Sequence, residues 1–140
     1  MSQTTTGTPL TPAAGIALFD RWTALWNGDF SDPERFLAPG FRIRFGNSPD
    51  RAEETDTIHG PQGIVEYVAS FRVARPRLRY AVDGTPLVDT ERGIVVSRWY
   101  VSGEDVAGDV TEKSGIDQFE VVDGRIATVW SVTGLRRFAP

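Results

Sequence analysis

Apolar residues recur at helical intervals in the first quarter of the chain. From Pro12 to about Phe30 they are spaced by three, four or seven positions, which predicts a helix with a wide apolar face. Gly28 predicts the end of this helix, because glycine readily takes the left-handed backbone of a C-terminal cap. A second, short helix is predicted next, since Ser31 can cap it, Glu34 can return the hydrogen bond and Pro39-Gly40 can end it.

After the second helix, apolar and polar residues first alternate, then return to helical spacing, and alternate again in the rest of the chain. Phe41 to Phe45 alternate apolar and basic side chains, as in a half-buried strand. Ile64 to Phe71 have helical spacing and predict a third helix that ends before Pro76. The later strands are predicted at Leu78 to Val82, Ile94 to Val101, Ile116 to Val122 and Arg125 to Val132, with turns at Asp83-Gly84, Ser102-Gly103 and Asp123-Gly124. This order predicts an α+β domain in which three N-terminal helices cover one face of a mostly antiparallel sheet.

The length of 140 residues fits a single domain. We expect it to occupy residues 12–140 behind a disordered tail of residues 1–11, which has no signal-peptide pattern. No apolar run approaches the roughly 20 residues that span a bilayer, so a cytoplasmic protein without membrane contact is expected. A net charge of -4 gives no general attraction to nucleic acid.

The chain has no cysteine and one histidine, His59. Thiolate sites and the usual zinc sites are therefore excluded, and we expect neither a metal nor a cofactor.

Two segments, His59 to Ile64 and Ser114 to Ile126, resemble the SnoaL-like branch of the nuclear transport factor two-like superfamily. The second has the family's glycine, apolar, Asp, x, Phe strand and its Asp-Gly turn, and the next strand ends in tryptophan. The resemblance covers about Pro12 to Thr133. It implies a cone-shaped, curved antiparallel sheet wrapped against the three helices around a deep apolar pocket. It also implies a homodimer through the opposite face of the sheet.

The resemblance makes Asp117 the leading candidate for catalysis. Its counterpart in the family's ketosteroid isomerase points into the pocket, which would place Phe119, Val129 and Ser131 on the same side and Trp130 on the other. Desolvation there would disfavour the ionised form, so Asp117 could stay protonated and donate to a substrate oxygen. The alternative is a structural aspartate, bonded to a backbone group or an arginine. Asp117→Leu would preserve folding in the first case and cost stability in the second.

The sequence departs from the catalytic patterns of known relatives at three positions. Trp22 stands where the isomerase has a hydrogen-bonding tyrosine, and Phe45 stands where it has a general base. Ser131 stands where SnoaL-type cyclases have an acidic residue. The candidate acid therefore lacks an evident base.

Other side chains have both a functional and a purely structural interpretation. Histidine is the residue type best suited to proton transfer near neutral pH, so His59 could act at the pocket mouth, or it could only satisfy local backbone before Gly60. Aromatic side chains could stack on a planar ligand or simply form the core. Arg72, Arg75, Arg77 and Arg79 could face an anionic partner, although alternation with Leu78 and Tyr80 favours a solvated strand face. The candidate ligand-binding residues are Trp22, Trp26, Phe45, Tyr67, Phe71, Trp99, Phe119, Val129 and Ser131.

Two functions follow as alternatives. The first is a small-molecule pocket protein that acts as an isomerase, cyclase or dehydratase on an apolar or aromatic substrate, with Asp117 as the acid. The second is a non-catalytic dimeric protein that uses the same pocket to bind a ligand.

Overall fold

A computed structural model describes residues 9–46 and 55–139 of the chain. The five strands form one sheet in the order β1-β5-β4-β3-β2, in which β1 runs parallel to β5 and all other neighbours are antiparallel. The elements are α1 (Pro12–Trp26), α2 (Pro33–Phe36), β1 (Leu37–Phe45), α4 (Gly60–Val73), β2 (Arg79–Asp89), β3 (Ile94–Glu104), β4 (Val110–Val122) and β5 (Arg125–Thr133).

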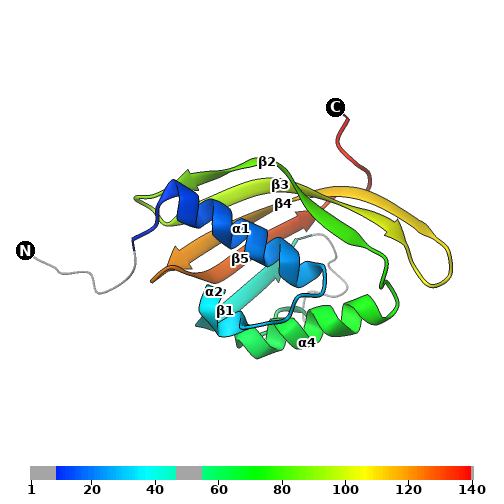
Figure 1. The fold of residues 1–140 in the computed structure, drawn as a ribbon, viewed down its shortest axis with the longest axis horizontal. Helices are drawn as coiled ribbons and strands as arrows, with labels where there is room; N and C mark the ends of the chain where they lie inside the picture. Colours follow the sequence, from blue (N-terminus) through cyan, green and yellow to red (C-terminus); the bar gives the residue numbers. More distant parts are fainter. Residues whose placement is uncertain (1–8, 47–54, 140) are drawn as a thin grey trace, which may run out of the picture.

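The helices cover one face of a curved sheet, as predicted (Figure 1). Helix α1 packs mainly on β2, and α4 packs on β1 at the opposite edge of the sheet. The space between the two helices and the concave face is filled partly by the core, where Phe19 of α1 stacks on Phe119 of β4 with ring centroids 4.8 Å apart. No helix among the described residues is long and apolar enough to cross a membrane.

The three predicted helices are present, but the expected serine cap of the second is wrong. Asp32, in a left-handed conformation with φ 46°, stands at the N-cap of α2 and makes no side-chain cap hydrogen bond. The Ser31 hydroxyl instead donates to Asp29 Oδ1 at 2.6 Å. A local hydrogen bond within the preceding turn thus competes successfully with the cap.

Several strands are longer than predicted, because two predicted turns lie inside strands. Asp83-Gly84 lies within β2, where the pairing with β3 shifts register between Asp83 and Leu87. Ser102-Gly103 lies within β3, and Gly103 has φ 140°. Gly84 thus accompanies an irregularity inside β2, whereas Gly103 is the next-to-last residue of β3 and pairs regularly with Thr111 of β4. The Asp123-Gly124 turn is confirmed, with φ 53° and 75° at its two residues.

The predicted sides of the strands are confirmed. Asp117, Phe119 and Val129 are buried, whereas Ile116, Trp130 and Val132 on the convex face are about half exposed. The strand β1 was predicted as part of a mostly antiparallel sheet, and its parallel pairing with β5 is the exception.

The predicted tail falls mostly outside the described residues, which begin at residue 9. Within them, Leu10 packs against the core and the Thr11 hydroxyl accepts a hydrogen bond from the Ala14 N–H at 3.1 Å. These two residues therefore belong to the folded part of the chain.

Candidate functional site

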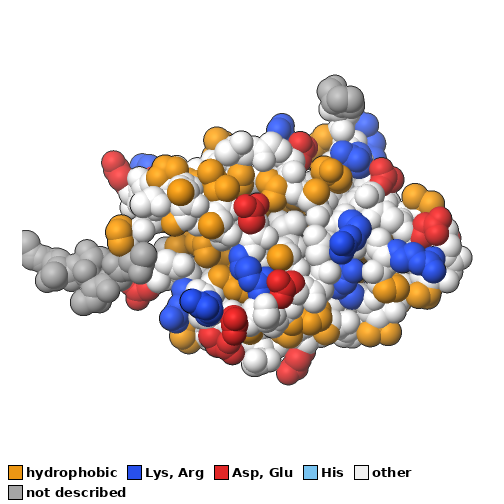
Figure 2. Space-filling view, viewed as in Figure 1, with side chains coloured by type: hydrophobic (Ala, Val, Ile, Leu, Met, Phe, Trp, Pro, Cys, Tyr) orange, Lys and Arg blue, Asp and Glu red, His pale blue; other side chains and the backbone are white. Residues whose placement is uncertain are grey.

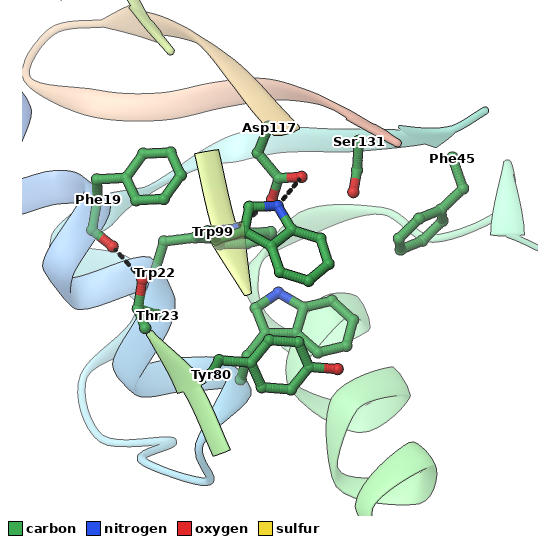
Figure 3. A pocket seen from close by; sticks show the side chains of 9 residues that line it. Phe19, Trp22, Thr23, Phe45, Tyr80, Trp99, Asp117 and Ser131 are labelled. Carbon is green, nitrogen blue, oxygen red and sulfur yellow. Dashed lines mark hydrogen bonds between the residues drawn. The ribbon is translucent and has the colours of Figure 1, made fainter. Parts of the chain in front are cut away.

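Asp117 lies in the middle of β4 with its carboxyl between two tryptophans (Figure 3). Trp22 Nε1 of α1 donates to Oδ2 at 2.9 Å, and Trp99 Nε1 of β3 donates to Oδ1 at 2.9 Å. Ser131 pairs with Asp117 across β4 and β5, and its side chain also hydrogen-bonds to the carboxyl. One helix and three strands thus contribute to this arrangement.

The environment acts on Asp117 in two opposite directions. Burial raises the pKa of the carboxyl, while the hydrogen bonds with Ser131, Trp22 and Trp99 lower it. Only 4% of the residue is exposed. The apolar surroundings therefore favour a proton on Asp117, and the three polar neighbours would stabilise the carboxylate once that proton is given away.

Gly115 allows Trp99 to reach Asp117. A Cβ atom at this position would lie 2.2 Å from the Trp99 ring and 2.6 Å from the Val132 carbonyl oxygen. The indole therefore lies over the backbone of β4 at the one place where no side chain blocks it. Gly115 belongs to the motif that carried the family resemblance. That it leaves space for the Trp99 ring was not evident from the sequence.

A small inner cavity of about 40 Å³ adjoins the Asp117 carboxyl. Six of its nine lining residues are aromatic, and its polar groups come mainly from Thr23, Tyr80, Asp117 and Ser131. A space of this size accommodates a water molecule or one small polar group of a ligand, and no more. The lining residues are Phe19, Trp22, Thr23, Trp26, Phe45, Tyr80, Trp99, Asp117 and Ser131.

A larger outer cavity of about 310 Å³ adjoins the inner one. The two share the rings of Trp26, Phe45, Tyr80 and Trp99, which pack on one another at centroid distances of 5.5 to 6.4 Å. The outer lining is completed by Thr55, Tyr67, Phe71, Arg75, Leu78, Val101, Thr111, Lys113 and Thr133. The pair of cavities suits a ligand with an apolar body and one polar group at its deep end.

Tyr80 is a site residue that sequence reasoning missed. Burial raises the pKa of its phenol, with a smaller opposing effect from Arg72, so the hydroxyl stays protonated at neutral pH. This protonated hydroxyl belongs to a side chain that lines both cavities. It is therefore a second donor available to a ligand. The signal was the alternation of Leu78, Tyr80 and Val82 with arginines, which put Tyr80 on the core side of its strand.

Most of the predicted site residues do meet at the two cavities. The structure brings together Asp117, Trp22, Trp26, Phe45, Tyr67, Phe71, Trp99 and Ser131. Phe119 and Val129 face the same side but lie deeper, with no exposed surface, and belong to the core.

His59 does not join the site. It is exposed at the N-cap of α4, where its extended backbone forms an isolated bridge with Arg42. Its side chain makes no cap hydrogen bond, and it lines neither of the two cavities. Backbone pairing of the start of α4 with β1 thus places His59 away from the residues that line the two cavities. Among the described residues no group of three or more His, Cys, Asp or Glu side chains could hold a metal ion.

Comparisons with known proteins agree with this architecture. A family model described as the SnoaL-like domain matches residues 17–129. The fold is similar to that of a candidate SnoaL-like polyketide cyclase from Jannaschia sp. CCS1, with a TM-score of 0.72 and 18% identity over 92% of each chain. It is also similar to TsrD from Streptomyces laurentii, with a TM-score of 0.71 and 22% identity over 90% of this chain and 92% of that one.

A third similar structure is a candidate isomerase of the SnoaL-like family from Agrobacterium tumefaciens str. C58. Its TM-score is 0.64, with 21% identity over 87% of this chain and 98% of that one. No curated protein matches the sequence. At this level of identity the similarity shows the fold, and function has to be argued from the site.

Proposed function

Because the chain belongs to the SnoaL-like domain family, we propose that it is a cofactor-independent isomerase, cyclase or dehydratase with Asp117 as its acid. Its substrate is an apolar or aromatic molecule, polyketide-like or steroid-like, that carries a carbonyl oxygen. One observation carries this proposal: Asp117 is a buried carboxyl in an aromatic cavity, held between the indole N–H groups of Trp22 and Trp99.

The chemistry common to these reactions is enolisation of a carbonyl compound. The substrate carbonyl enters the inner cavity and accepts the proton of Asp117, while a water molecule from the solvent accepts the proton of the neighbouring C–H bond, so that an enol, a carboxylate and a hydronium ion are formed. Asp117 becomes a carboxylate, whose charge is stabilised by Trp22, Trp99 and Ser131. The hydrogen bonds around Asp117 are thus stronger after proton transfer than before it, as catalysis requires.

The alternative function is non-catalytic binding of a similar ligand, and one observation favours it. The described lining of the inner cavity contains no imidazole and no carboxylate besides Asp117, so no evident base faces the substrate. A ligand oxygen could bind there without reacting.

Exchange of the α-protons of 1-tetralone into deuterated water, followed by NMR, separates the two functions without knowledge of the natural substrate. The catalytic proposal expects the protein to accelerate exchange, and Asp117→Asn to reduce the acceleration by roughly 10²-fold to 10⁴-fold. Ser131→Ala should reduce it by about tenfold, since one hydrogen bond to the carboxylate that forms at Asp117 is lost. Glu120→Gln is the matched control, because Glu120 lies on β4 with an exposed carboxylate on the other face.

Each other outcome decides against the catalytic proposal. Calorimetric binding of 1-tetralone with no acceleration of exchange would establish the binding function instead. Exchange that is equally fast in Asp117→Asn, at a temperature where this variant is folded by circular dichroism, would remove Asp117 from the mechanism. Absence of both binding and exchange would contradict a site for this class of ligand.

A further inference from the structure

The four arginines near the end of α4 have different environments. Figure 2 shows basic side chains gathered on this face, around the end of α4 and the start of β2. Arg72 donates to the carbonyl oxygens of Trp26, Leu78 and Pro76 at 2.9 to 3.0 Å and so holds the chain after α4. Arg77 and Arg79 are exposed, and Arg77 forms an ion pair with Glu104. Of the four, only Arg75 lines the outer cavity.

Arg75 is held in a fixed place at that cavity. Its guanidinium carbon lies 4.5 Å from the centre of the Phe71 ring, and Nη1 donates to the Phe71 carbonyl oxygen at 3.2 Å. Lys113 of β4 lines the same cavity and is half-buried. Neither cation forms an ion pair within the described part of the chain, and the described lining of this cavity contains no aspartate or glutamate.

Two half-buried cations without an acidic partner are unusual on the wall of a cavity that is also lined by six aromatic side chains. Partial burial weakens solvation of both charges, and each retains N–H donors for an anion. A carboxylate between them would accept charge-assisted hydrogen bonds. Thr111 and Thr133 add hydroxyl groups to the same wall.

The strand β4 fixes how far this basic end lies from Asp117. Lys113, Gly115 and Asp117 follow one another on its concave face. Four residues of strand span about 13 Å between the Cα atoms of Lys113 and Asp117. A flat bicyclic or tricyclic body fits between a polar group at Asp117 and an anion near Lys113.

We propose that the outer cavity binds a carboxylate of the substrate through Arg75 and Lys113. The substrate is then an elongated aromatic keto acid, with its reacting carbonyl at Asp117 and its carboxylate at the opposite end. This inference rests on the proposed ligand site, and adds the charge and the orientation of the ligand.

The test compares 6-carboxy-1-tetralone with its methyl ester, because the two differ only at the end remote from the ketone, where the ester carries a methyl group in place of the negative charge. Isothermal titration calorimetry of the wild-type protein should show the acid binding about 10-fold to 100-fold more tightly than the ester. Arg75→Gln and Lys113→Gln should each weaken binding of the acid by about tenfold and leave binding of the ester unchanged. Arg79→Gln removes the same charge from the exposed surface nearby and should leave the affinities for both compounds within about twofold of the wild-type values.

Ester binding also shows that each variant is folded. Equal affinity of wild-type protein for acid and ester would overturn the carboxylate site while leaving the ligand site in place. A loss of acid affinity in Arg79→Gln equal to that in Arg75→Gln would show that the basic surface attracts the acid in general. That result would also overturn the carboxylate site. If neither compound binds, the ligand site fails and this inference fails with it.

Discussion

Replacement of Asp117 by leucine removes the acceptor of two buried indole N–H groups at once. Leucine is similar in size and suits an apolar wall, so the change alters polarity more than packing. The Nε1 atoms of Trp22 and Trp99, each 2.9 Å from a carboxyl oxygen, would lose that acceptor. A buried donor without a partner costs about 1 to 3 kcal/mol, so two cost about 2 to 6 kcal/mol.

Part of this cost is offset, because the variant no longer buries a carboxyl group. We therefore expect a net loss of about 1 to 4 kcal/mol in the free energy of unfolding, which corresponds to a fall in melting temperature of roughly 3 to 12 °C for a chain of this length. The sequence alone suggested that a catalytic Asp117 would tolerate leucine. The structure gives Asp117 a structural role beside any catalytic one, so loss of stability does not exclude catalysis.

The assay is urea denaturation followed by circular dichroism, in a cycle with Trp99→Phe. In the wild-type background Trp99→Phe leaves one carboxyl oxygen without its donor. In the Asp117→Leu background it removes an N–H group that already lacks its acceptor, so the second change should cost about 1 kcal/mol less. Glu120→Leu, on the exposed face of β4, is the control and should change the free energy of unfolding by no more than about 0.5 kcal/mol. Additive costs for Asp117→Leu and Trp99→Phe, or an Asp117→Leu variant as stable as wild type, would refute this account of the carboxyl.

Three further predictions concern pH, packing and association. The raised pKa of Asp117 means that its protonated form is favoured by folding, so its contribution to stability is full below pH about 4 and is lost as the pH rises through the folded-state value. The free energy of unfolding of wild type relative to Asp117→Asn should fall over this range in urea titrations at successive pH values, and a rise would contradict the direction of the shift. Gly115→Ala should lower the free energy of unfolding by about 1 to 3 kcal/mol in thermal melts, because its Cβ would overlap Trp99, whereas Gly40→Ala, with nothing within 4 Å, should not. Sedimentation should show a homodimer through the convex face, where Trp130 is 43% exposed, and Trp130→Glu should give a monomer of 15.4 kDa; a monomeric wild type at micromolar concentration would disprove the dimer.

The sequence by itself determined most of the local structure. Helical spacing placed α1 and α4, and alternation placed the faces of β3, β4 and β5, because both periods follow from backbone geometry within a few residues. The Asp123-Gly124 turn was predictable for the same reason. The sequence also indicated Asp117 and most of the aromatic rings of the candidate site. It did so through the side on which each strand presents its side chains and through the family motif.

Only the tertiary structure decided which groups meet. Trp22 and Asp117 are 95 positions apart, and their hydrogen bond depends on how α1 crosses the sheet. Local patterns gave no reason to expect the parallel pairing of β1 with β5, which brings together the first and the last strand in chain order. The tertiary structure also decided that Tyr80 lines the two cavities and that His59 does not. It placed Arg75, alone among its neighbouring arginines, on the wall of the outer cavity. The type of a residue fixes its chemistry, and the periodicity of its helix or strand fixes the side on which it points. Its partners, however, come from other elements, which the local sequence does not describe.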